Sequence, residues 1–353
     1  MNSKEIEIRG EDIVFLLGAG ASYKAGIPIS QKMVAKVESL IKENDSWKKF
    51  RELYFYLKSS ILYSKGIFGE FDNGSFNIEN LLVIISNLKE KDKNPIYPFI
   101  GSWDLRLIDL AGNEFSFLKE LDNKIREELI NWVSPPQYSK ANYYNGFLSL
   151  KNEIMQTLKV FSLNYDLCFE KVIGENLVET GFGDGSEWHY SNFDLESNPK
   201  DFYLYKLHGS INWYIDDDTR KVNKNDNIQT RNPQLIFGIE HKLHSIDPYF
   251  YYSSEFRKAT LDCKLILSIG YSFEDNYING ILSQAIKSKD NVTLLSVQPL
   301  SKSIETELKS KIRNKLELDT DTQIVIENDC AETFFENKMN KNFLSQYINN
   351  EVF

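Results

Sequence analysis

The chain has 353 residues, of which 42% are hydrophobic and 26% charged, and its net charge is −10. This composition predicts a soluble globular protein with a large core, arranged as one large or two medium domains. No apolar run reaches the roughly 18 residues that span a membrane. The N-terminal segment Met1–Glu5 lacks the regions of a secretory leader. We therefore expect a cytoplasmic protein without a membrane partner, and the acidic balance argues against direct binding to nucleic acid.

The first motif lies close to the N-terminus. Ile13–Leu17 is an apolar run that predicts a buried strand, and Gly18–Ser22 follows it with the sequence Gly-Ala-Gly-Ala-Ser. Glycines at this point let the backbone approach a pyrophosphate, and the amides of the next helix start face its charge. The third glycine of the usual dinucleotide fingerprint is replaced by Tyr23, and Gly26–Pro28 follows as Gly-Ile-Pro. The segment therefore predicts a dinucleotide-phosphate site that differs from that of ordinary dehydrogenases.

A helical region follows this motif. Apolar residues recur with helical spacing, or in runs without Pro or Gly, in four segments: Gln31–Glu43, Trp47–Leu62, Phe76–Leu88 and Phe115–Val133. We predict a helical insertion subdomain at residues 31–155. Residues 1–30 and 156–353 would then form the main domain.

Lys159–Asp166 predicts a strand that ends in a polar Asn-x-Asp, and three further segments rich in apolar residues follow it: Leu204–Ser210, Lys264–Phe273 and Val292–Pro299. Beyond them we expect a polar helix over Ser301–Leu316, a short strand over Gln323–Ile326 and a final helix over Cys330–Ile348. Three phenylalanines of that last helix either cap the sheet or form a subunit interface: Phe334, Phe335 and Phe343.

Two polar segments have simple interpretations. Gly181–Gly185 is rich in glycine but follows no clear strand, so a surface turn is favoured over a phosphate loop. Asp216–Asp218 places three carboxylates together without a second ligand cluster, which favours a solvated hairpin turn over a cation site. Three of the four histidines, His189, His241 and His244, have no partner pattern, and we expect surface or packing roles for them.

The motifs, taken in order, resemble those of the sirtuin family. Gly-Ala-Gly-Ala-Ser with Gly-Ile-Pro is similar to the first sirtuin motif, and Lys159–Asp166 resembles the Thr-Gln-Asn-Ile-Asp segment. Leu204–Ser210 resembles the strand that carries the catalytic histidine, Lys264–Phe273 the Gly-Thr-Ser segment, and Val292–Pro299 the last core strand. The resemblance implies an α/β fold, with a Rossmann-like parallel sheet, helices on both faces and a large helical insertion.

The resemblance also implies a site. Asn164 would orient the ribose or a water, because its amide offers a donor and an acceptor and never ionises. His208 would transfer a proton, since imidazoles do so near neutral pH. Asp166 matches a family position near the nicotinamide. Taken without the family, Asn164 and Asp166 are also candidate helix caps, and His208 beside a glycine is a candidate structural histidine. The implied cofactor-binding residues are Gly18, Ala19, Gly20, Ser22, Gly26, Pro28, Gly270, Ser272 and Gln298.

The departures from the family indicate a subtype. The sirtuin Asp-Phe-Arg after Gly-Ile-Pro is replaced by Ile29–Gln31, which puts deacetylase-type handling of acyl-lysine in doubt. The three scattered cysteines, Cys168, Cys263 and Cys330, include no Cys-x-x-Cys pair, so this sequence has no four-cysteine zinc module, and we predict no metal site. They also indicate a reducing compartment.

This sequence, which lacks the zinc cysteines and has a large predicted insertion, is similar to bacterial sirtuin-like effectors of anti-phage defence, such as the sirtuin subunit of sirtuin–HerA-like systems. The resemblance implies an NAD+ hydrolase that takes NAD as its substrate, forms a homo-oligomer and awaits a separate trigger protein, either a HerA-type ATPase or a short Argonaute. Two alternatives stay open. One is a non-catalytic module that binds NAD or ADP-ribose in a defence complex, and the other is an NAD-dependent protein deacylase.

Overall fold

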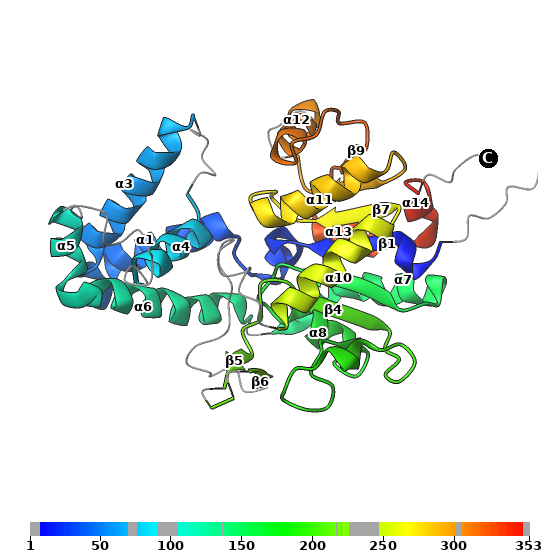
Figure 1. The fold of residues 1–353 in the computed structure, drawn as a ribbon, viewed down its shortest axis with the longest axis horizontal. Coiled ribbons are helices and arrows are strands. Elements are labelled where there is room, and N and C mark those ends of the chain that lie inside the picture. Colours follow the sequence, from blue (N-terminus) through cyan, green and yellow to red (C-terminus); the bar gives the residue numbers. More distant parts are fainter. Residues whose placement is uncertain are drawn as a thin grey trace, which may run out of the picture. The chain divides into compact units, whose positions relative to one another are not determined.

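The structure is a computed structural model that describes residues 8–69, 76–89, 105–135, 137–216, 218–219, 221–225, 247–300 and 305–348. The chain divides into two compact units (Figure 1). The first comprises Met1–Ile27 with Ser134–Phe353, and the second is Pro28–Val133. The helical unit thus ends well before residue 155, the predicted end of the insertion. The difference arises because Tyr144 and Phe147 pack against aromatic side chains of the first unit, including Phe169.

The first unit is built on a seven-stranded sheet with the order β3-β4-β2-β1-β7-β8-β9. Its strands are β1 (Ile13–Leu17), β2 (Leu158–Ser162), β3 (Val178–Glu179), β4 (Phe202–Lys206), β7 (Leu265–Ile269), β8 (Thr293–Val297) and β9 (Ile324–Glu327). Every neighbouring pair is parallel. The predicted parallel α/β sheet is therefore confirmed, whereas the two-residue β3 was not predicted, and for the segment that holds β7 only a motif was predicted. The strand order reverses between β1 and β7, so a topological switch point lies there.

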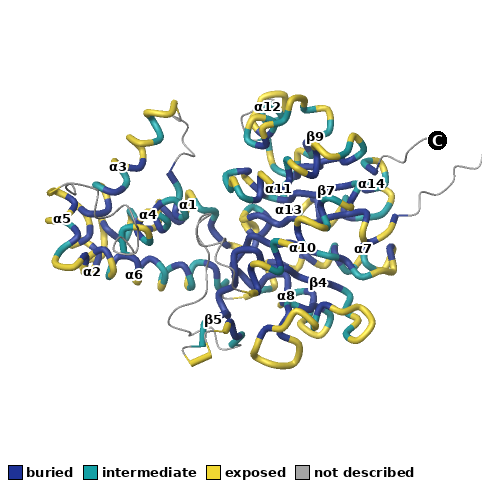
Figure 2. The backbone as a smooth tube through the Cα atoms, viewed as in Figure 1, coloured by how far each residue is buried: buried dark blue, intermediate teal, exposed yellow. Residues whose placement is uncertain are grey.

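Helices cover both faces of this sheet, because successive strand residues point to opposite sides. On one face Val14 and Leu16 join a core cluster with α10 (Tyr249–Asp262), α11 (Asn276–Ser288) and α12 (Glu305–Lys315). On the other face Phe15 contacts Phe147 of α7 (Gly146–Ile154), which also contacts α8 (Cys168–Ile173) and α13 (Ala331–Asn337). Figure 2 shows the resulting buried strands between partly exposed helices.

The C-terminal part differs from its prediction. The expected single helix over Cys330–Ile348 consists of α13 and a second helix, α14 (Lys341–Ser345). Asn340 separates them, since its side chain accepts a hydrogen bond from the N–H of Phe343 at 2.9 Å and starts a new helix. Phe334 and Phe335 are buried within the first unit, and Phe335 stacks on Tyr143, so these two rings take the capping role.

The second unit is helical. It contains α1 (Ser30–Glu43), α2 (Asp45–Lys48), α3 (Arg51–Ile67), α4 (Ile78–Lys89), α5 (Leu105–Ala111) and α6 (Ser116–Val133). The predicted helices agree with α1, α4 and α6, whereas the segment Trp47–Leu62 is broken between α2 and α3. Asp122 is fully buried in this unit and forms ion pairs with Lys89 and Arg126, so its charge is compensated.

The two polar segments form turns. β5 (Trp213–Ile215) and β6 (Val222–Lys224) are an antiparallel pair. The half-buried Asp216 begins their connection, where its carboxylate accepts the N–H of Thr219 at 2.7 Å; Asp217 lies outside the described residues. In the glycine-rich segment, the N–H groups of Gly181 and Gly183 both donate to the Glu179 carboxylate, so these amides serve a turn.

Within the described ranges, none of the helices combines the length and apolar character needed to cross a membrane.

Candidate functional site

The sequence-predicted residues gather at one edge of the sheet. Gly18, Asn164, His208, Gly270 and Gln298 follow β1, β2, β4, β7 and β8 respectively, each within two residues of the strand end. Because these strands are parallel, their carboxyl ends share this edge. It includes the switch point between β1 and β7, which is where open α/β sheets bind ligands.

Two glycine loops are in direct backbone contact at the switch point. The N–H of Gly20 donates to the carbonyl oxygen of Gly270 at 2.9 Å. A Cβ added at Gly18 would lie 2.6 Å from the same oxygen, and one added at Gly270 would lie 2.3 Å from the backbone nitrogen of Ala21. Gly270 also has a φ of +66°, which favours glycine. Because these glycines have no side chains, the β1 and β7 loops can pack together. This packing role does not depend on any contact of the glycines with a phosphate.

The residues after Gly18 form the short helix η2 (Ala19–Ala25). Ala19 is exposed at its start, and Gly26 ends it with a φ of +94°. Ser22 is fully buried and does not present its hydroxyl to solvent. Its Oγ lies 3.0 Å from the hydroxyl of Tyr144 and accepts a hydrogen bond from Nδ2 of Asn164 at 3.3 Å. Ser22 thus connects the first motif to the β2 loop and fixes the amide of Asn164.

Tyr144 belongs to η6 (Tyr138–Asn145), which also contributes Tyr143. The Tyr143 hydroxyl donates to the carbonyl oxygen of Ala21 at 2.7 Å. Burial, reinforced by the nearby Asp166 carboxylate, raises the pKa of the Tyr144 hydroxyl well above its ordinary value of 10.0. The hydroxyl therefore stays neutral, and η6 holds η2 through uncharged hydrogen bonds.

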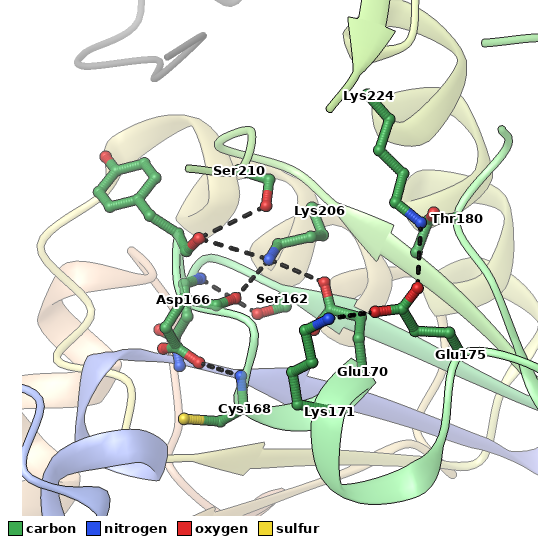
Figure 3. A network of polar contacts seen from close by, with 12 residues as sticks. Ser162, Asp166, Cys168, Glu170, Lys171, Glu175, Thr180, Lys206, Ser210 and Lys224 are labelled. Carbon is green, nitrogen blue, oxygen red and sulfur yellow. Dashed lines mark hydrogen bonds and ion pairs between the residues drawn. The ribbon is translucent and has the colours of Figure 1, made fainter. Parts of the chain in front are cut away.

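The Asp166 carboxylate is used within its own loop. One of its oxygens accepts the N–H of Cys168, the first residue of α8, at 2.9 Å, which forms a local turn in front of the helix. The Lys206 ammonium, only 1% exposed, donates to the carbonyl oxygens of Tyr165 and Asp166 and lies 3.0 Å from an oxygen of Glu170 (Figure 3). Lys206 ends β4 two residues before His208, so it joins the Asn164 loop to the strand that carries the histidine.

His208 is 4% exposed, and its Nε2 lies 3.0 Å from Oδ2 of Asp275. Asp275 follows β7, and in the sheet β4 and β7 are separated by β2 and β1. At the usual strand spacing, β4 and β7 are about 14 Å apart. The contact between His208 and Asp275 therefore bridges the ends of the two strands between them. The other ring nitrogen, Nδ1, is buried without a hydrogen-bond partner among the described residues.

The remaining predicted residues are less constrained. Ser272 is exposed beside Gly270, and Gln298 is half-buried with its amide donating to the Ser296 hydroxyl at 2.9 Å. Pro28 is buried and is the first residue of the second unit. Of the other histidines, His189 is exposed and bonds Ser191, whereas the two near residue 240 lie outside the described residues.

Three side chains of this site were missed from the sequence: Tyr144, Lys206 and Asp275. Lys206 had a weak signal, because a lysine that ends an otherwise apolar strand requires a partner. The sequence also contains a weak signal for Asp275, since an aspartate directly before an apolar helical pattern is typical of a helix cap. Nothing in the sequence around Tyr144 indicates a link to the first motif.

A cavity of about 580 Å³ lies beside these loops. It is lined by Glu170, Glu179, Asn212 and Trp213, among others, and includes none of the sequence-predicted site residues. Within the part of the chain that the structure describes, no group of three or more His, Cys, Asp or Glu side chains is arranged to hold a metal ion.

Comparison with known proteins gives one domain match and several distant structural similarities. A search of curated proteins gives no significant sequence match. Among solved structures, a Sir2 homologue in complex with NAD is 10% identical, with 98% of this chain and 96% of that chain covered and a TM-score of 0.47. A triple mutant of Sir2 homologues with 2′-O-acetyl ADP-ribose is 11% identical, with both chains fully covered and a TM-score of 0.45. Residues 158–320 match the model of the SIR2-like domain.

Proposed function

We propose that this chain hydrolyses NAD+ at the bond between nicotinamide and ribose, which gives nicotinamide and ADP-ribose. One observation carries the proposal. Asn164 and His208 are both buried at the carboxyl edge of parallel strands, next to the switch point, and Nδ1 of His208 has no hydrogen-bond partner within the described part of the chain. Both residues lie within the segment that matches the SIR2-like domain. A buried acceptor without a partner fits a ligand hydroxyl or a water.

The reaction needs few groups. When the C1′–N bond breaks, nicotinamide leaves with the bonding electrons and becomes neutral, while positive charge develops on the ribose. A water oxygen then bonds to C1′, and the water releases a proton. In this proposal the Asn164 amide orients the ribose or the water, and His208 accepts the proton. Asp166 completes the proposed set from the β2 loop, and the Gly18–Ser22 and Gly270–Ser272 loops face the phosphates.

We further propose that hydrolysis depletes NAD during anti-phage defence. The sequence resemblance to sirtuin-like defence effectors supports this role, as does the absence of the sirtuin zinc cysteines and Asp-Phe-Arg from this sequence. In such a system the chain acts as a homo-oligomer, and a separate protein, a HerA-type ATPase or a short Argonaute, triggers it. The net charge of −10 supports recognition of nucleic acid by that partner and not by this chain.

The test is NAD consumption by the full chain, alone and with each candidate trigger protein, with nicotinamide and ADP-ribose quantified. Asn164→Ala and His208→Ala should each abolish turnover. The exposed His189 and Asn337 provide matched controls, and both alanine variants should retain wild-type rates. Turnover that persists in both site variants would refute the proposal. Turnover only after addition of an acyl-peptide would indicate a deacylase, and NAD binding without turnover under every condition would indicate the non-catalytic module.

A further inference from the structure

We infer that Asp275 positions His208 and sets its tautomer, so that Nδ1 is the nitrogen that takes part in the reaction. This inference rests on the proposed hydrolysis and goes beyond it, because it names the reacting atom and a residue that the sequence did not identify. Asp275 acts through His208 and is a positioning residue.

Both oxygens of the Asp275 carboxylate are engaged. Oδ1 accepts the N–H groups of Tyr277 and Ile278 at 3.0 and 3.2 Å, which caps the 13-residue helix α11. Oδ2 lies 3.0 Å from Nε2 of His208. The helix N-terminus favours a negative charge on this group. The carboxylate is therefore held as an oriented acceptor, and the capping bonds fix which oxygen faces the imidazole.

The loop that presents Asp275 is itself rigidly built. The Tyr271 hydroxyl lies 3.1 Å from the Asp275 carbonyl oxygen and 2.8 Å from Oδ1 of Asn279. The Asn279 amide in turn donates to the carbonyl oxygen of Phe273 at 2.8 Å. Phe273 has a φ of +60°, a conformation that side-chain-bearing residues rarely adopt. Buried hydrogen bonds thus maintain a strained backbone in the segment that places the carboxylate.

The tautomer follows from this geometry. A carboxylate accepts hydrogen bonds only, so the neutral imidazole of His208 must carry its proton on Nε2. Nδ1 then has a free lone pair, is buried and has no partner among the described residues. Turning the ring over would place a carbon against Asp275, so the pairing also fixes the ring orientation. In the proposed reaction, Nδ1 is the atom that accepts the proton from water as the oxygen bonds to C1′.

The first test is independent of activity. The sequence has only four histidines, so selective ¹⁵N-histidine labelling of the full chain gives a simple spectrum, and His208→Ala assigns the signal. For neutral His208 we expect a protonated Nε2 and an unprotonated Nδ1. Asp275→Asn retains a good helix cap but can donate to Nε2, and it should reverse or mix the tautomers. A wild-type ring protonated at Nδ1, or an unchanged tautomer in Asp275→Asn, would overturn the inference.

The second test uses turnover. Asp275→Asn should lower kcat by about 10²- to 10⁴-fold, the usual worth of a positioned proton-transfer group, while the affinity for NAD stays within about threefold. Asp275→Ser should lower kcat in the same way, because serine also caps helices. Asn340→Ala removes a cap from α14, far along the chain, and should leave kcat unchanged. Wild-type kcat in Asp275→Asn would contradict the inference. If the wild-type chain never hydrolyses NAD, the proposed function fails, and the tautomer measurement still decides the role of Asp275.

Discussion

The ammonium of Lys206 lies 3.0 Å from the carboxylate of Glu170, and the two side chains are 1% and 11% exposed. The same ammonium donates to the carbonyl oxygen of Asp166 in the β2 loop (Figure 3), and Asn164 lies two residues earlier in that loop. A buried ion pair of this kind adds little stability by itself, but loss of one partner leaves an uncompensated buried charge. The pair therefore ties the stability of the fold to the geometry of the site.

Lys206→Met should lower the free energy of unfolding by about 3–5 kcal/mol, because the buried carboxyl group of Glu170 loses its partner. The double variant with Glu170→Leu should recover much of this loss. Lys171 and Glu175 form a matched exposed pair, and Lys171→Met should cost less than about 1 kcal/mol. Urea titration followed by circular dichroism measures all three values. Equal losses for Lys206→Met and Lys171→Met would show that burial of the first pair is unimportant.

The hydrogen bonds of Ser22 lead to a second prediction. Tyr144→Phe removes one hydroxyl but leaves the Asn164 amide its own bond to Ser22, so it should cost about 0.5–1.5 kcal/mol of stability. Ser22→Ala removes the anchor of Asn164 and should lower kcat for NAD more than Tyr144→Phe does. Steady-state kinetics with thermal unfolding as a control separates the two effects. The anchoring role would be wrong if Tyr144→Phe proved the more damaging to kcat.

The contact between the glycine loops gives a third prediction. Gly270→Ala places a Cβ 2.3 Å from a backbone nitrogen at a φ of +66°, so the loops must separate. We expect a loss of about 1–3 kcal/mol from backbone strain and weakened NAD binding. Gly280 is the control, because it lies in α11 with nothing within 4 Å of an added Cβ. Gly280→Ala should stabilise the protein by roughly 0.5–1 kcal/mol. Calorimetry of binding and unfolding compares the two variants, and similar outcomes would exclude the close-packing role of Gly270.

Much of the fold was predictable from the sequence, because parallel strands buried on both faces are short apolar runs. Ile13–Leu17 is such a run and matches β1 in both bounds. The helix breaks were harder, because a polar residue such as Asn340 either continues a helix or caps a new one, and tertiary packing decides. β3 was missed because two residues carry no periodicity.

The residues of the candidate site were predictable only where a motif exists. Asn164 and His208 follow strands and match a known pattern, so their shared edge could be expected. The partners of the site could not, since Tyr144 and Ser22 are 122 residues apart and Asp275 and His208 are 67 apart. Such contacts arise from strand order and from helix positions. No local signal in the sequence specifies them.

The buried thiols predict how stability depends on pH. Burial raises the pKa of Cys263 to about 12, and burial together with the neighbouring Asp166 raises the pKa of Cys168 further. In the unfolded chain both thiols ionise near 9.0, while in the folded chain they stay protonated. Above pH 9 the unfolded state therefore binds fewer protons, and the free energy of unfolding falls as pH rises.

The slope contributed by each thiol approaches about 1.4 kcal/mol per pH unit. Urea titrations between pH 8 and pH 10.5 should show this decline, and Cys263→Ala should make it shallower. Cys330 is half-buried, and Cys330→Ala is measured in parallel as the comparison thiol. A slope that is the same in both variants would show that Cys263 ionises alike in the folded and unfolded chains.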